Sequence, residues 1–109
     1  MNAFALDTAF AALADPTRRA IVERLAQQPA RVTDVAEPFA MSLNAISKHV
    51  KTLERAGLVK RVRTGREHML VLQPEPLREV TTWTSRFEEF WNDRLDRLEQ
   101  YLETEDEKE

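Results

Sequence analysis

Apolar side chains recur at helical spacing in the first quarter of the chain. In the segment 3–13, AFALDTAFAAL, they fall at positions 3, 6, 10 and 13, which predicts an amphipathic helix. Asp15 and Pro16 then mark the start of a second helix, because aspartate caps free N–H groups and proline is tolerated at the first helical position. We expect this helix to run to about Gln28. Its core-facing side chains are Ile21, Val22 and Leu25.

Two further helical segments follow. Thr33 is a candidate cap for a short third helix, VTDVAEPF, residues 32–39, which Pro38 limits or kinks. Ser42 is a candidate cap for a fourth helix that ends at Ala56-Gly57, where the glycine serves as a left-handed terminator. At about 100° per residue, one side of this fourth helix is apolar. That side consists of Leu43, Ile46, Val50 and Leu53.

The pattern changes after Gly57. Segments 58–63 and 67–72 are rich in valine, leucine and methionine and flank Thr64-Gly65-Arg66, so we predict a two-stranded hairpin with a tight turn. Prolines at 74 and 76 end the second predicted strand. A long helix is then predicted from about Glu75 to Leu102. The fold class is therefore mainly α with one β-hairpin, in the order α-α-α-α-β-β-α.

A short helix, a turn, a second helix and a hairpin give the outline of a winged helix-turn-helix. The 109 residues of the chain suit one compact domain. We assign residues 1–102 to this domain and residues 103–109, which are acidic, to a disordered tail.

The side of the fourth helix opposite its apolar face carries hydrogen-bond donors, as a helix that reads the major groove of DNA must. Asn44 can pair with an adenine edge, and Lys48 and Lys51 can bind guanine edges or phosphates. Arginines at the hairpin tip can hold a phosphate or enter a minor groove. His49 lies between the two faces. The residues predicted to contact DNA are Ser42, Asn44, Ala45, Ser47, Lys48, His49, Lys51, Arg63 and Arg66.

The formal net charge of −3 conceals an uneven distribution. Residues 42–68 carry a net charge of +5, whereas residues 75–109 carry −7. Because salt screens charges beyond about 10 Å, a basic face can bind DNA while an acidic region points away. A merely solvated helix face is the simpler interpretation of the polar residues. The capped upstream helix and the basic hairpin that follows favour double-stranded DNA as the partner.

The first and last predicted helices carry more apolar surface than a small domain has room to bury. We predict that they form a twofold dimer interface, which would place two recognition helices about 34 Å apart on a palindromic operator. Part of this surface must pack on its own domain, and a hydrophobic effector between the last helices is a further interpretation. The predicted interface residues are Phe4, Leu6, Phe10, Leu13, Trp83, Phe87, Phe90, Trp91, Leu95 and Leu98.

Other classes of function lack the residues they need. The chain has no cysteine, and its only two glycines, Gly57 and Gly65, are explained by turns. No side chain that could act as a catalytic nucleophile has a plausible general base. Arg18 is expected to make a structural ion pair or a phosphate contact and to have no catalytic role. We predict no enzymatic activity, no cofactor and no metal site. No apolar run reaches the length of a membrane span and the N-terminus is unlike a signal peptide, so we predict a cytoplasmic protein without a membrane partner.

Three stretches together resemble one known family: ADPTRRAIVERLA, then EPFAMSLNAISKHVKTLERAGLVKRVRTGREHMLVL, then the aromatic last helix. Over about residues 4–102 the chain resembles the ArsR-type winged-helix transcriptional regulators. The resemblance implies a homodimeric repressor that binds a palindromic operator and regulates nearby genes. A winged-helix protein-interaction module that never binds DNA is the alternative, but it would not need a segment of charge +5.

Within that family, metal-sensing members carry a Cys-x-Cys pair on the helix before the recognition helix, or a zinc site with histidine on the last helix. Here the first of these helices reads VTDVAEPF and the last has no histidine. The chain is therefore similar to a cysteine-free subgroup, often encoded beside START-like, polyketide-cyclase-type proteins.

Overall fold

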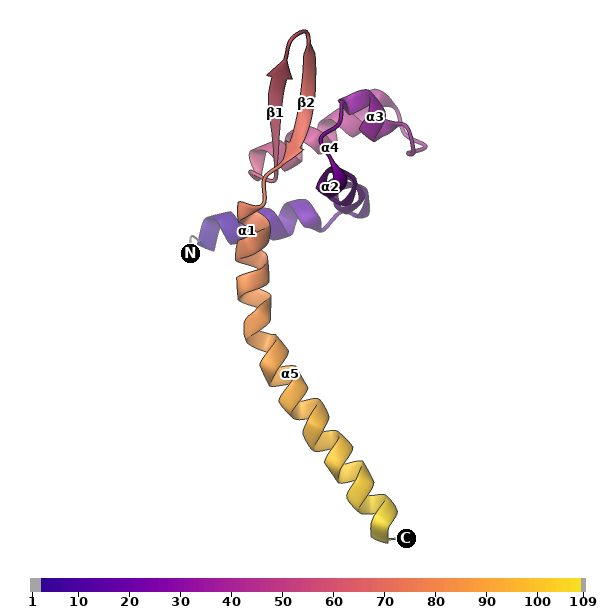
Figure 1. The fold of residues 1–109 in the computed structure, drawn as a ribbon, viewed down its shortest axis with the longest axis vertical. Coiled ribbons are helices and arrows are strands. Elements are labelled where there is room, and N and C mark those ends of the chain that lie inside the picture. The colour runs from indigo at the N-terminus through magenta and orange to yellow at the C-terminus, as the bar shows by residue number, and fades with distance from the viewer. Residues whose placement is uncertain (1–2, 109) are drawn as a thin grey trace.

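The computed structural model describes the backbone of residues 3–108 and the side chains of residues 5–106. Its elements follow the predicted order. They are α1 (Ala3–Leu13), α2 (Pro16–Gln27), α3 (Val32–Ala36), α4 (Leu43–Arg55), β1 (Val59–Thr64), β2 (Glu67–Leu72) and α5 (Glu75–Lys108). Helices α1 to α4 and the hairpin gather at one end of the molecule, and α5 extends away from them (Figure 1).

The starts of α2 and α4 are fixed by the caps that the sequence predicts. The carboxylate of Asp15 accepts a hydrogen bond from the N–H of Arg18 at 3.0 Å. The hydroxyl of Ser42 accepts one from the N–H of Ala45 at 3.1 Å. Each cap satisfies a donor that has no partner inside the helix, so it sets the residue at which the helix begins.

Helix α4 ends at a glycine in the left-handed conformation, as predicted. Gly57 has a φ of 75°. Its N–H donates to the carbonyl of Glu54, and the N–H of Leu58 donates to the carbonyl of Leu53, both at 3.0 Å. This pair of bonds is a Schellman motif, which satisfies the last carbonyls of a helix and turns the chain. The turn delivers the chain directly into β1.

The two strands form an antiparallel hairpin whose register runs from Val59 opposite Leu72 to Thr64 opposite Glu67. A two-residue loop joins them, and its first residue, Gly65, has a φ of 66°. Glycine at this position suits a tight turn that matches the twist of the strands. The root of the hairpin is anchored by Ala30, which exchanges two backbone hydrogen bonds with Leu70.

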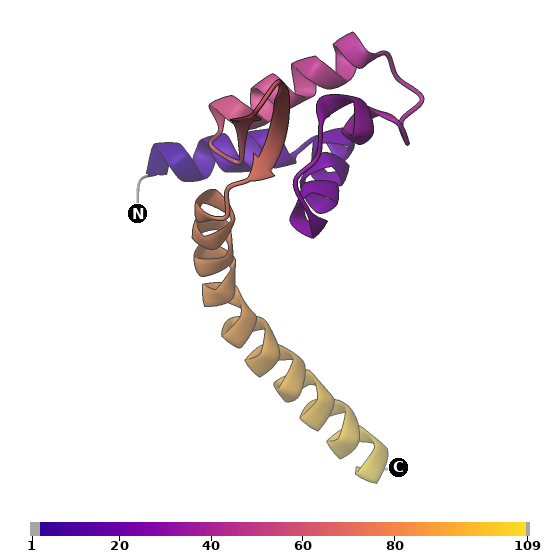
Figure 2. The same cartoon turned by 45° about the horizontal axis from the view of Figure 1, so that its top comes forward.

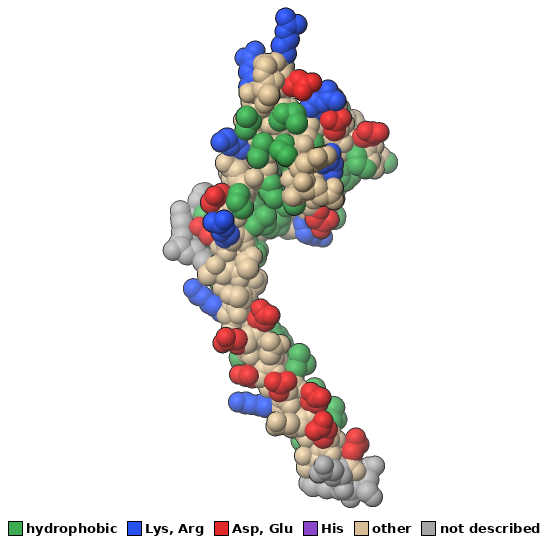
Figure 3. All heavy atoms as spheres, viewed as in Figure 1, with side chains coloured by type: hydrophobic (Ala, Val, Ile, Leu, Met, Phe, Trp, Pro, Cys, Tyr) green, Lys and Arg blue, Asp and Glu red, His purple; other side chains and the backbone are tan. Residues whose placement is uncertain are grey.

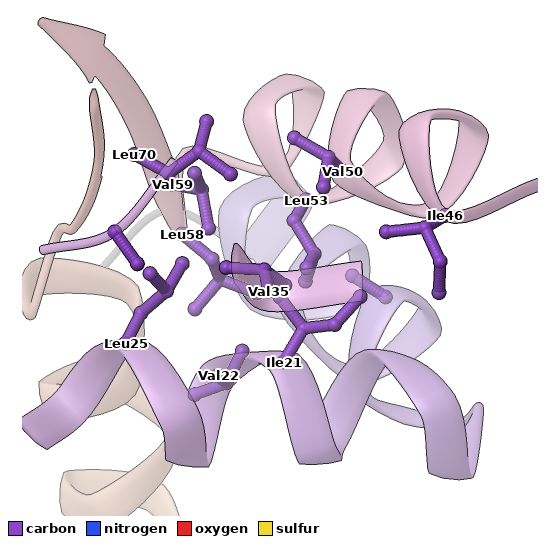
Figure 4. Close-up of a cluster of buried hydrophobic side chains, with 12 residues drawn as sticks. Ile21, Val22, Leu25, Val35, Ile46, Val50, Leu53, Leu58, Val59 and Leu70 are labelled. Atoms are coloured by element: carbon purple, nitrogen blue, oxygen red, sulfur yellow. The ribbon is translucent and has the colours of Figure 1, made fainter. Parts of the chain in front are cut away.

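The core lies between α2, α4 and the root of the hairpin, with Val35 of α3 also inside (Figure 4). Its fully buried large side chains come from five elements and from the residue before β1. They are Ile21, Val35, Ile46, Val50, Leu53, Leu58, Val59 and Leu70. The predicted core residues of α2 are also buried. This core holds α4 with its opposite side toward solvent.

Several sequence predictions need correction. Leu43 belongs to the predicted apolar side of α4 but is 49% exposed, because the first turn of α4 extends past the core. Thr33 does not cap α3, because the helix begins at Val32 and Thr33 lies inside its first turn; the cap residue is Arg31, which makes no side-chain cap hydrogen bond. Helix α3 also ends at Ala36 instead of residue 39, since Pro38 has no N–H to continue it. Residues 103–108, predicted as a disordered tail, continue α5.

Helix α5 gives the molecule its elongated shape. Its 34 residues correspond to about 51 Å of helix. Only its first turns lie beside α1, and the remainder extends away from every other described element in both views (Figures 1 and 2). The radius of gyration is 19.9 Å, whereas a compact domain of this length would have about 13 Å. No helix within the described range is long and apolar enough to cross a membrane.

Candidate nucleic-acid interface

The predicted recognition face of α4 is open to solvent. Asn44, Lys48 and Lys51 are exposed, and Ser47 is half-buried at the edge of the face. Within the described residues neither lysine makes an ion pair. Two uncompensated ammonium groups and an amide therefore share one side of a helix that the core holds rigidly from the other side. This arrangement offers donors to base edges and to phosphates.

The first turn of α4 adds backbone donors to this face. Ser42 and Asn44 are exposed, while Ala45 is half-buried. The cap from Ser42 satisfies one N–H, and the remaining N–H groups of the first turn have no partner inside the helix. Because the N-terminus of a helix also carries a partial positive charge, it is suited to a phosphate oxygen.

The hairpin tip carries two exposed arginines. Arg66 is the second residue of the turn and makes no ion pair within the described residues. The Nε of Arg63 donates to the carbonyl of Gly65 at 3.1 Å, which fixes this side chain along the turn. Basic side chains project from the hairpin tip, away from the acidic length of α5 (Figure 3).

Two other cations of this region are bound to acids. Arg61 pairs with Glu54 of α4 at 3.0 Å, so its charge is compensated locally. Arg31 pairs with Asp34 at 3.1 Å and reaches Glu67 at the start of β2 at 3.4 Å. The carboxylate of Asp34 raises the pKa of Arg31 above its usual value. Both acidic residues of the segment 42–68 are thus engaged, which leaves the exposed lysines and tip arginines to set the local charge.

His49 occupies a different environment from the lysines beside it. Its Nδ1 lies 3.3 Å from a guanidinium nitrogen of Arg18 and 3.9 Å from the carboxylate of Asp15. The pKa of Asp15 lies below its usual value, chiefly because its carboxylate accepts a hydrogen bond from the N–H of Arg18. The charge of His49 contributes to the same lowering. This ring faces the start of α2, so His49 links the recognition helix to the N-terminal helices and stands apart from the exposed donors.

Arg18, for which the sequence predicts a structural ion pair or a phosphate contact, binds backbone carbonyl groups of α1. It donates to the carbonyl of Ala12 at 2.6 Å and to that of Ala11 at 3.2 Å. Arg19 donates in the same way to Leu13 at 2.8 Å. The two arginines therefore satisfy the last carbonyls of α1 and join α1 to α2. Positive side chains at this end of a helix are also favoured by its dipole.

Comparison with known proteins shows the family of this chain. The chain is 39% identical over 99 residues to the HTH-type transcriptional regulator Rv2034 of Mycobacterium tuberculosis, covering 91% of this chain and 90% of the relative. A crystal structure of an ArsR family transcriptional regulator superposes with a TM-score of 0.74 at 37% identity, covering 84% of this chain and 95% of that one. The chain belongs to the ArsR family.

The ArsR-family assignment accounts for the elements described above. A family model described as a helix-turn-helix domain matches residues 13–62, which span α2, α3, α4 and the first four residues of β1. The transcriptional repressor SdpR of Bacillus subtilis is 30% identical over 82 residues, covering 75% of this chain and 91% of that protein. This ArsR-family chain is a winged helix-turn-helix DNA-binding transcriptional regulator, as the names of these relatives indicate.

Apart from Phe4, the residues predicted to form a dimer interface divide into two groups. Leu6 is buried within the chain and Leu13 packs against the core, so these two serve the domain itself. The backbone of Phe4 lies in α1, but its side chain is outside the described part. The others are exposed large hydrophobic residues: Phe10, Trp83, Phe87, Phe90, Trp91, Leu95 and Leu98.

Sequence reasoning missed two features of this site. It did not identify Arg31, whose link to β2 holds the loop before α3 against the hairpin, because no motif marks such a contact. It also placed Leu43 on the apolar side of α4, although Leu43 and Met41 are exposed at the start of α4. A helical wheel places Leu43 about 60° from Ile46, at the border between the two faces, which was the available signal.

Proposed function

We propose that this ArsR-family regulator is a dimeric repressor that inserts α4 into the major groove of a palindromic operator. The observation that carries the proposal is the exposed face of Asn44, Lys48 and Lys51, which has no acidic neighbour in an ion pair with it among the described residues. With α4 in the groove, Arg66 and Arg63 at the hairpin tip would reach the adjacent backbone or minor groove.

The charge distribution supports one orientation on DNA. Residues 42–68 carry a net charge of +5, and the acidic residues of the C-terminal part lie along α5, which extends away from the hairpin tip (Figure 3). A duplex approaching the hairpin and α4 would meet a positive potential, while the acidic helix would remain on the far side. Local phosphate contacts can therefore outweigh the net charge of −3.

A dimer is supported by the exposed apolar stripe of α5. Hydrophobic and aromatic side chains recur along one side of this helix from residue 83 to residue 102 and remain exposed in the single chain. A contiguous apolar surface of this kind marks an interaction site in a water-soluble protein. A second copy would cover the stripe by twofold symmetry and would match two recognition helices to a palindrome.

The test is fluorescence anisotropy of the full chain with the duplex upstream of its own gene and with a scrambled duplex, across a salt series. We expect preferential binding to the upstream duplex, with affinity falling steeply as salt increases. Equal and weak binding to both duplexes would place the operator elsewhere. No binding even at low salt would contradict DNA binding and favour a protein-interaction module.

A charge-matched pair of variants separates the face of α4 from net charge. Lys48→Glu with Lys51→Glu should abolish binding to the duplex. Arg86→Glu with Arg97→Glu makes the same change in net charge on exposed positions of α5. The second variant should retain most of the affinity because its charges lie far from the DNA. Equal losses in the two variants would show that net charge, and not the α4 face, controls binding.

A further inference from the structure

We propose that Leu43, the first residue of α4, contacts the 5-methyl group of a thymine in the major groove and so helps to select the operator sequence. This inference rests on the proposed binding mode of α4. It adds an apolar determinant to a face that was interpreted only through its hydrogen-bond donors.

Exposed apolar side chains are unevenly distributed in the molecule. Among the described residues, nearly all the exposed large hydrophobic side chains belong to α1 or α5, where the proposed dimer accounts for them. The exceptions are Met41 and Leu43, which are 39% and 49% exposed. They lie on either side of the cap residue Ser42, at the leading end of the recognition helix. Neither the core nor the apolar stripe of α5 explains their exposure.

Leu43 has a favourable position on the helix. The hydrogen bond from the Ala45 N–H to Ser42 fixes the start of α4, so Leu43 occupies the first turn. On a helical wheel it lies about 40° from Ser47, next to the polar face. In helix-turn-helix proteins the N-terminal residues of the recognition helix contact base edges. Leu43 therefore lies nearer to the leading end of the helix than Lys48 and Lys51, and it is placed to reach a base.

The chemistry of the leucine side chain matches one base. A leucine side chain neither donates nor accepts a hydrogen bond, and thymine is the base whose major-groove edge presents a methyl group. Asn44, the next residue, has the amide that can pair with the N6 and N7 atoms of adenine. The two adjacent residues together favour A·T pairs under the first turn of α4.

Met41 provides a matched control from the same stretch. It precedes the cap and lies outside the helix, and its Sδ accepts a hydrogen bond from the hydroxyl of Thr17 in α2 at 3.9 Å. This contact directs the Met41 side chain toward α2. Met41 is of similar size and exposure to Leu43, but its side chain is not positioned by the first turn of α4.

The experiment replaces each thymine of the upstream duplex, one at a time, by uracil, which lacks only the methyl group. Anisotropy titrations compare these duplexes with the parent for wild type, Leu43→Ala, Leu43→Met and Met41→Ala. Burying one methyl group corresponds to about a fourfold change in affinity. Wild type should lose about this factor at one position or more in each half-site. Leu43→Ala should bind thymine and uracil equally there, whereas Leu43→Met and Met41→Ala should still discriminate.

Three results would overturn the inference. Wild type could bind every uracil duplex as tightly as the parent, or Leu43→Ala could keep the full discrimination. Loss of discrimination in Met41→Ala alone would assign the contact to Met41 instead. A wild type that binds no duplex at all contradicts the proposed function itself, so the two failures are distinguishable. Far-ultraviolet circular dichroism of each variant checks that α4 remains folded.

Discussion

Single residues at the hairpin tip differ in the partners that their charges already have. Arg66 makes no ion pair in the described part of the chain, whereas Arg61 is held by Glu54 at 3.0 Å. We therefore expect Arg66 to release counterions from DNA and Arg61 to contribute little. Arg66→Ala should weaken binding to all duplexes alike and reduce the slope of log affinity against log salt by about one. Arg61→Ala is the matched control, and equal slopes for wild type and Arg66→Ala would contradict the contact.

Asp15 makes the stability of the domain depend on pH. The N–H of Arg18 holds the pKa of this carboxyl below its usual value. A lowered pKa in the folded state means that ionised Asp15 stabilises the fold at pH values above the ordinary carboxyl pKa, and that this contribution is lost as pH falls through the folded-state pKa. Asparagine can also cap a helix but does not ionise.

Urea denaturation of wild type and of Asp15→Asn between about pH 2 and pH 6 measures this contribution to the free energy of unfolding. The free energy of unfolding of wild type should exceed that of the variant most at the upper end of this range. The difference should shrink as the pH falls. A difference that stays constant with pH would show that the charge of Asp15 adds nothing beyond capping.

At the scale of the elements, the sequence was most informative where a helix is bounded by its own side chains. Asp15, Ser42 and Gly57 act within three residues of the groups that they satisfy, so their roles follow from local chemistry. Helix α3 has no side-chain cap, and the residue two positions before it, Ala30, forms a bridge with Leu70, a contact across the fold. Such a contact leaves no trace in the local pattern.

The candidate site was predictable to a similar degree. The wheel of α4 separated its buried residues from Asn44, Lys48 and Lys51, because this helix is strongly amphipathic. It could not place His49, whose neighbours Asp15 and Arg18 are more than 30 residues earlier in the chain. Border positions such as Leu43 depend on how far the core extends along the helix, which the sequence alone does not specify.

The junction between α4 and the hairpin depends on one backbone conformation. Gly57 has a φ of 75°, and an added Cβ would lie 3.7 Å from Cγ of Pro76, an ordinary contact. The cost of Gly57→Ala therefore comes from the left-handed backbone and should be about 1–2 kcal/mol in the free energy of unfolding. Gly57→Asn should recover part of it, since asparagine tolerates this conformation. Denaturant titration measures both, and equal losses for the two variants would refute the backbone explanation.

At the scale of the whole molecule, the single chain is divided by charge and by shape. One end holds the core, the recognition helix and the basic hairpin, and the other is a projecting helix with acidic residues on one side and an apolar stripe on another (Figures 1 and 3). The overall extents are 71 × 33 × 21 Å, and beyond its first turns this helix has no contact with the other described elements. Since isolated helices are marginal in water, a partner that covers the stripe would stabilise α5 as well as the assembly.

Trp91 tests whether that partner is a second copy. It is 59% exposed in the middle of the stripe, and its ring lies 5.9 Å from that of Phe90. Trp91→Glu would place a charge in the proposed interface, so we expect monomers by sedimentation equilibrium and loss of high-affinity binding to the upstream duplex. Asn92→Glu adds the same charge one residue later, outside the stripe, and should remain dimeric. A dimer that survives Trp91→Glu would move the interface to another surface. If wild type itself is monomeric, the apolar stripe must instead serve a different partner, and the operator would no longer need twofold symmetry.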